Sequence, residues 1–131
     1  MRIKQLTLAV AALVLLGGHA IAGVPAQQQQ DEEKAKAENW ITQADSTKAL
    51  VESVLASALE AGAEEHAVAK DQVNDARHWL VEAENALAAA KEAMAAEDYK
   101  RAANMGNMAW QYYVKAGTAA VLASKIATGG A

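Results

Sequence analysis

Residues 69–94, AKDQVNDARHWLVEAENALAAAKEAM, contain two sets of residues that repeat every seven positions. The first set is small and consists of Ala69, Ala76, Ala83 and Ala90. The second set is larger and consists of Val73, Leu80, Leu87 and Met94, and His66, just before the stretch, continues it. Alternating steps of three and four residues place both sets on one side of an α-helix. We therefore expect a helix whose line of alanines allows other helices to approach closely.

The same pattern occurs on both sides of this stretch. The preceding segment has small residues at Ala37, Ala44, Val51 and Ala58, with companions at Trp40, Thr47, Val54 and Ala61. The following segment has Ala102, Ala109, Ala116 and Ala123, with companions at Tyr99, Gly106, Tyr113, Ala120 and Ala127. The pattern breaks by a step of five residues after Ala61 and again after Met94, which a continuous coiled coil would not contain. The sequence thus predicts three helices, at about 31–61, 64–96 and 99–128.

Capping residues agree with these boundaries. Gly62 follows the first predicted helix, as a C-terminal cap does, and Asp98 is suited to cap the start of the third. The acidic residues 31–33 suit the positive end of the first helix dipole, and Gly129-Gly130 ends the last helix. Pro25 is the only proline, and no strand pattern is present.

Pairing the alanines across the two turns predicts the topology. When Ala69 lies opposite Ala123, the antiparallel pairing centres on residue 96, at the second turn. When Ala58 lies opposite Ala69, it centres between residues 63 and 64, beside Gly62. The predicted fold is all-α, an antiparallel up-down-up three-helix bundle over residues 31–128 with left-handed crossing. The alternative is a helical hairpin that dimerises into a four-helix bundle.

The N-terminus indicates export. Arg2 and Lys4 precede an apolar run at 6–16, and Ala20-Ile21-Ala22 offers small residues for signal peptidase. We interpret residues 1–22 as a bacterial signal peptide and expect a periplasmic protein. Cleavage after Ala26 and an uncleaved anchor are the alternatives. Residues 23–30, with glutamine at 27–30, are expected to form a flexible mature N-terminus, and 129–131 a short tail.

Charge and composition exclude several classes. Without the signal peptide the chain has 10 basic and 16 acidic residues, a formal charge of −6, which argues against nucleic acid as a partner. No transmembrane helix is expected after signal cleavage. Cysteine is absent, and no nucleophile context, phosphate loop or haem-attachment motif occurs, so we expect no enzyme and no cofactor.

The third predicted helix carries the features that favour a protein partner. From Tyr99 onward there is no acidic residue, while Lys100, Arg101, Lys115 and Lys125 are basic. These cations either pair with the acidic helices inside the bundle or form a docking face. The apolar face of this helix is wide, which indicates self-association or a protein partner bound through residues 99–128.

Aromatic residues provide the partner-binding candidates. Trp79, Trp110, Tyr112 and Tyr113 lie at similar height in the predicted register. They either close the flank of the bundle or form an exposed patch that anchors a partner, since such residues dominate interface energetics. Trp40 lies on the line of companion residues and is expected in the core.

Weaker candidates exist for a divalent metal such as Cu, Ni or Zn. They are His66 with the adjacent Glu65, and Asp75 with His78 at a spacing of three residues on one helix face. The alternative roles are a half-exposed packing residue for His66 and a solvated polar pair for Asp75 and His78. Met105 and Met108 offer soft sulfur for Cu(I) or, alternatively, adaptable core packing.

Three segments carry a resemblance: GAEEHA at 62–67, DARHWLVEAENAL at 75–87 and AAEDYKRA at 95–102. They resemble the alanine-rich helical domains of unknown function in bacterial envelope lipoproteins. They are also similar to the periplasmic small metal-binding proteins, which are antiparallel helical bundles. The resemblance implies a helical bundle in the envelope and, from the second group, binding of copper, nickel and other divalent ions. The chain departs from the lipoproteins by lacking cysteine, and from the metal-binding group by keeping only His66 and His78 after residue 22.

These features together predict a non-catalytic periplasmic helical bundle that acts through protein–protein contact as a subunit, adaptor or envelope scaffold. The alternative function is low-affinity binding or buffering of a divalent metal.

Overall fold

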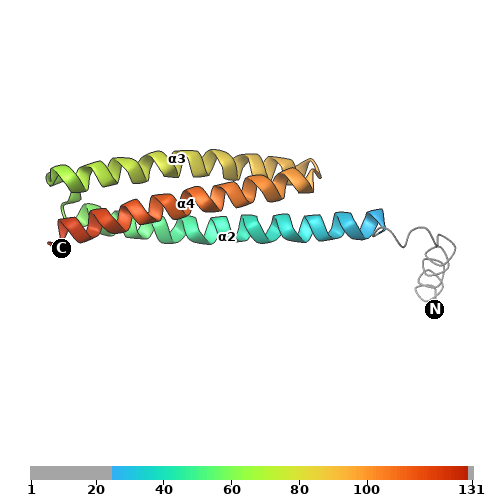
Figure 1. Ribbon diagram of the computed structural model, residues 1–131, viewed down its shortest axis with the longest axis horizontal. Helices are drawn as coiled ribbons and strands as arrows, with labels where there is room; N and C mark the ends of the chain where they lie inside the picture. The colour runs from blue at the N-terminus through green and yellow to red at the C-terminus, as the bar shows by residue number, and fades with distance from the viewer. Residues whose placement is uncertain (1–24, 130–131) are drawn as a thin grey trace. The chain divides into compact units, whose positions relative to one another are not determined.

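The computed structural model describes residues 25–129. Within that range the elements are helix α2 (Ala26–Glu60), the short 3-10 helix η2 (Ala63–Glu65), helix α3 (Ala67–Ala95) and helix α4 (Tyr99–Ala127), with no strand. Contacts divide the chain after Glu32, and the three helices pack against one another in the unit that begins at Glu33 (Figure 1). The predicted all-α three-helix bundle is therefore confirmed. The predicted signal peptide at 1–22 lies outside the described residues.

Helix α2 begins five residues earlier than expected. The amide of Gln29 donates to the carbonyl oxygen of Pro25 at 3.0 Å, and Gln27 Nε2 donates to Asp31 Oδ1 at 3.1 Å. Glutamine has good helix propensity, and the fixed φ of proline suits the entry to a helix. Residues 26–30 are therefore helical, so the helix begins before the predicted position 31 and the acidic residues 31–33 lie beyond the first turn.

The predicted alanine lines form the core. Every alanine in them has zero exposure, and Val51, which takes an alanine position in α2, is nearly as inaccessible. These alanines are Ala37, Ala44, Ala58, Ala69, Ala76, Ala83, Ala90, Ala102, Ala109, Ala116 and Ala123. Tyr113 and Val73 are the largest fully buried side chains among the described residues. The bundle thus gains its stability from close contact over long helices rather than from bulky side chains.

Three buried clusters show the register. Ala58, Ala69 and Ala123 belong to one cluster, and Ala37 and Ala102 to another. The cluster between them contains Ala44, Ala83 and Ala109. Each group brings together alanines that the two predicted hairpins pair, so the up-down-up topology places α2 and α4 in the same direction with α3 antiparallel to both.

The turn between α2 and α3 differs from the expected one. Gly62 has φ +84 and its amide donates to Leu59 O at 3.0 Å, which confirms the cap. The chain then forms η2, and His66 is extended at φ −108, ψ 124, so α3 begins at Ala67 rather than at residue 64. Arg77 Nη1 lies 2.7 Å from Glu64 Oε1 and links η2 to α3.

The second turn matches the expectation. Asp98 caps α4, since its Oδ1 accepts from the Arg101 amide at 3.3 Å, and Glu97 has φ 60. In the described part of the chain, no helix combines the length and apolarity that crossing a membrane requires.

Candidate functional site

The four aromatic partner candidates separate into three environments. The rings of Trp79 and Tyr112 stack at 5.4 Å on the α3/α4 side. Trp110 instead contacts Trp40 of α2, with ring centroids 5.5 Å apart. Tyr113 is completely buried, so its side chain is not available to a partner. The four candidates therefore do not lie in one patch, because neighbouring positions on α4 face different helices.

Trp79 lies in a small cluster of polar and aromatic groups. Lys115 Nζ lies 4.3 Å from the centroid of the Trp79 ring and 5.8 Å from that of Tyr112. His78 contacts the same indole edge-on, at 5.1 Å between centroids. A cation over an aromatic face is attracted by the electrons of the ring, so Lys115 holds this flank of α3 against α4.

The metal-ligand candidates lie apart. His66 is exposed and precedes α3, so its predicted position on the packing face of that helix is wrong. Glu65 is exposed in η2, and the His78 ring contacts the Trp79 ring. Asp75 borders a shallow groove beside Trp79 and Lys115. The described residues contain no group of three or more His, Cys, Asp or Glu side chains placed to hold a metal ion.

The two methionines of α4 differ in exposure. Met105 is half-buried against the middle of the core, whereas Met108 is exposed. Met105 therefore contributes to packing, as one of the two interpretations of the sequence expects.

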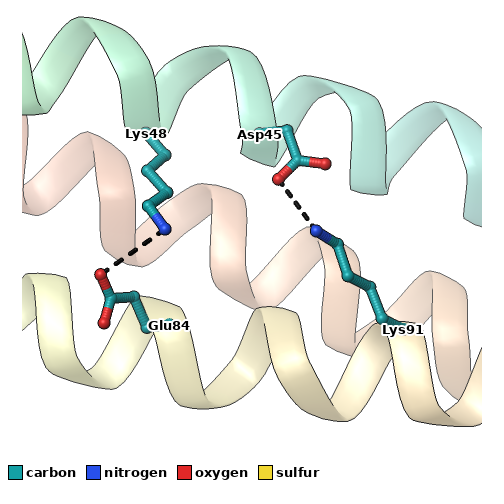
Figure 2. Close-up of polar contacts among 4 residues, drawn as sticks. All are labelled: Asp45, Lys48, Glu84 and Lys91. Atoms are coloured by element: carbon teal, nitrogen blue, oxygen red, sulfur yellow. Dashed lines mark hydrogen bonds and ion pairs between the residues drawn. The ribbon is translucent and has the colours of Figure 1, made fainter.

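The ion pairs lie on the α3 side of the bundle. Lys48 pairs with Glu84 at 3.7 Å and Asp45 with Lys91 at 3.2 Å, both between α2 and α3 (Figure 2). The third ion pair is the one between η2 and α3. Among residues 25–129 no ion pair involves a cation of α4. Pairing of these cations with the acidic helices is therefore not what holds α4 in place.

An open apolar groove with a volume of about 460 Å³ lies between α2 and α4. It is lined by Leu50, Val51, Val54, Gly117, Thr118, Val121, Leu122 and Lys125. Leu50 is 67% exposed, more than any other large apolar side chain in the described range. Thr118 and Leu122 also border the smaller groove toward α3, so the outer surface of α4 separates two hollows.

The seven-residue repeats do not predict the groove, because neither Leu50 nor Gly117 belongs to any of the repeating sets. The sequence nevertheless contains an indication of this apolar surface. The exposed residues that lie three, four or seven positions from Leu50 are all uncharged; they are Gln43, Ser46, Ser53 and Ser57. On α4, Trp110, Val114, Gly117 and Val121 follow one another at helical spacing.

Tyr113 is an ionisable residue in the core of the bundle. Its hydroxyl is buried and has no hydrogen-bond partner within the described residues. Burial, together with smaller contributions from the carboxylates of Glu84, Asp45 and Glu52, raises the pKa of Tyr113 to about 12. The phenol is therefore protonated throughout the neutral range and acts as a core side chain.

Comparisons of the chain with protein-family models, with curated proteins and with solved structures gave no significant match.

Proposed function

We propose that the protein is a non-catalytic helical bundle that acts through protein–protein contact at the α2/α4 groove and the outer surface of α4. The observation that carries the proposal is the apolar groove itself, with Leu50, Val121 and Leu122 exposed along it. Charged residues are depleted at the centres of protein interfaces, and a groove of this kind matches that composition. The predicted signal peptide supports a periplasmic location.

Two further observations support contact at this surface. Lys115 contacts Trp79, but the other cations of α4 take part in none of the described ion pairs, so they remain able to interact with a partner at the rim of the surface. Trp79 borders the hollow on the other side of α4, and Tyr112 stacks on its ring, so the pair adds aromatic area. Trp110 lies at helical spacing before Val114 and Gly117, toward the α2 side. The non-catalytic part of the proposal rests on the lack of catalytic motifs in the sequence.

Crosslinking from a single cysteine tests the proposal, because the chain has no cysteine of its own. Thr118 borders both grooves, so the Thr118→Cys variant is exported by the cells and its cysteine is labelled with a photo-crosslinker. Asn85→Cys on the exposed surface of α3 is the matched control. We expect a discrete protein adduct from position 118, lost when Leu122→Glu is added, and none from position 85. No adduct, or equal adducts from both positions, would contradict the proposal.

A further inference from the structure

We propose that the α2/α4 groove is filled by the same surface of a second copy of this chain, in a symmetric dimer in which Leu50 of each copy enters the groove of the other. This inference rests on the proposed function and deepens it by naming the partner.

The surface carries both a projection and a hollow. Leu50 is 67% exposed at the edge of the groove. The hollow beside it has a volume of about 460 Å³ and is lined on α4 by Val121 and Leu122. A two-fold interface brings one surface patch against its own copy, so the patch must supply both complementary shapes. The α2/α4 surface meets this requirement.

The charge pattern also favours a second copy. On the α2 side the exposed neighbours of Leu50 are Gln43, Ser46, Ser53 and Ser57, and α4 has no acidic residue. Lys125 is the only charged residue that lines the groove. A groove with a single charged lining residue can meet its own copy with Lys125 as the only like-charged residue among those that line it. An acidic partner, by contrast, would have only Lys125 to pair with inside the groove.

The available area is sufficient for a stable dimer. A helix of 29 residues, such as α4, is about 44 Å long at 1.5 Å per residue. Two adjacent helices of this length, each about 10 Å wide, therefore present roughly 900 Å². A standard protein interface buries about 800 Å² on each partner. The α2/α4 surface is thus large enough to hold two copies together.

Analytical ultracentrifugation over a range of concentrations tests the dimer. Two variants introduce the same charge at an exposed apolar position. Leu50→Glu lies in the groove, and Val81→Glu lies on α3 at 56% exposure and does not line it. We expect the wild type and Val81→Glu to dimerise alike and Leu50→Glu to weaken the dimer at least tenfold. Circular dichroism melts confirm that both variants remain folded.

A mixture of two single-cysteine chains supplies an independent readout. Leu50→Cys and Thr118→Cys line the same groove and should form a mixed disulfide between copies on oxidation, whereas Asn85→Cys should not. A wild-type monomer at all concentrations, or a dimer unaffected by Leu50→Glu, overturns the inference. Native mass spectrometry that finds a small molecule in the groove of a monomer also overturns it.

The two proposals fail in different ways. If the chain is monomeric but Thr118→Cys still crosslinks to a different protein in cells, the dimer is wrong and the protein-contact function stands. If neither self-association nor an adduct is observed, both are wrong.

Discussion

A β-carbon on Gly106 would lie 3.0 Å from the Cβ of Trp40 and 3.3 Å from the backbone nitrogen of Ile41. Glycine at this position therefore allows α4 to lie against the backbone of α2. A backbone cannot move aside as the end of a flexible side chain can, so the two helices would have to separate to admit a larger residue.

Gly106→Ala is expected to destabilise the bundle. Alanine improves helix propensity by about 1 kcal/mol, but overpacking against a backbone costs about 1–3 kcal/mol. We expect a net loss of about 1 kcal/mol, measured by urea unfolding. Gly117→Ala is the matched control, since its nearest contact is Val51 Cγ2 at 3.2 Å, and we expect it to be neutral or stabilising. Equal losses in the two variants would contradict this account.

Tyr113→Phe is expected to raise stability at neutral pH by about 1 kcal/mol, because it removes a buried hydroxyl that has no partner. The effect depends on pH. The pKa of Tyr113 rises from 10.0 to about 12 on folding, so above pH 10 the unfolded chain releases this proton first. The wild type should therefore lose stability from pH 10 toward pH 12, and the variant should lose less. Thermal melts of both proteins across this range measure the difference, and parallel losses would exclude the role of Tyr113.

Introducing glycine at the second turn and removing it from the first should change the stability of the bundle in opposite directions. Glu97 has φ 60, a conformation that costs an L-residue roughly 1–2 kcal/mol. Glu97→Gly removes that cost but adds flexibility to the unfolded chain, so we expect a gain of about 0.5 kcal/mol. Gly62 has φ +84, and Gly62→Ala should lose about 1 kcal/mol. Chemical denaturation of both variants checks the signs, and the same sign in both would refute the assignment.

The ion pairs between α2 and α3 are expected to add little stability. Asp45 and Lys91 are about half exposed, and water screens exposed pairs to within about 1 kcal/mol. A double-mutant cycle with Asp45→Asn and Lys91→Gln should give a coupling below 1 kcal/mol that decreases further in 0.5 M salt. A salt-independent coupling of several kcal/mol would show that the pair is much less hydrated than its exposure indicates.

The repeat predicted the core because burial follows directly from spacing. Residues seven apart share one side of a helix, so the burial of Ala69, Ala76 and Ala83 needed only the sequence period. Asp98 and Gly62 were predictable for a local reason, since each caps a helix end within a few residues of itself.

The candidate surface was less predictable because it depends on handedness. Pairing alanines fixes which helices are neighbours along the chain, but not on which side of α2 the third helix lies. That choice leaves Leu50 exposed beside α4. The same geometry separates adjacent residues, since Tyr112 and Tyr113 point about 100° apart and only the second faces the core. The helical start at Ala26 was missed because a glutamine tract was interpreted from composition rather than from helix propensity.

The short connections at Gly62–His66 and Ala96–Asp98 have a consequence for the speed of folding. Each joins two helices that pack on each other, so the pairing begins next to the turn and extends outward from it. Helical proteins dominated by such local contacts fold in microseconds to milliseconds. We therefore expect stopped-flow tryptophan fluorescence to report refolding within milliseconds, with no slow phase from proline, because Pro25 precedes the packed helices.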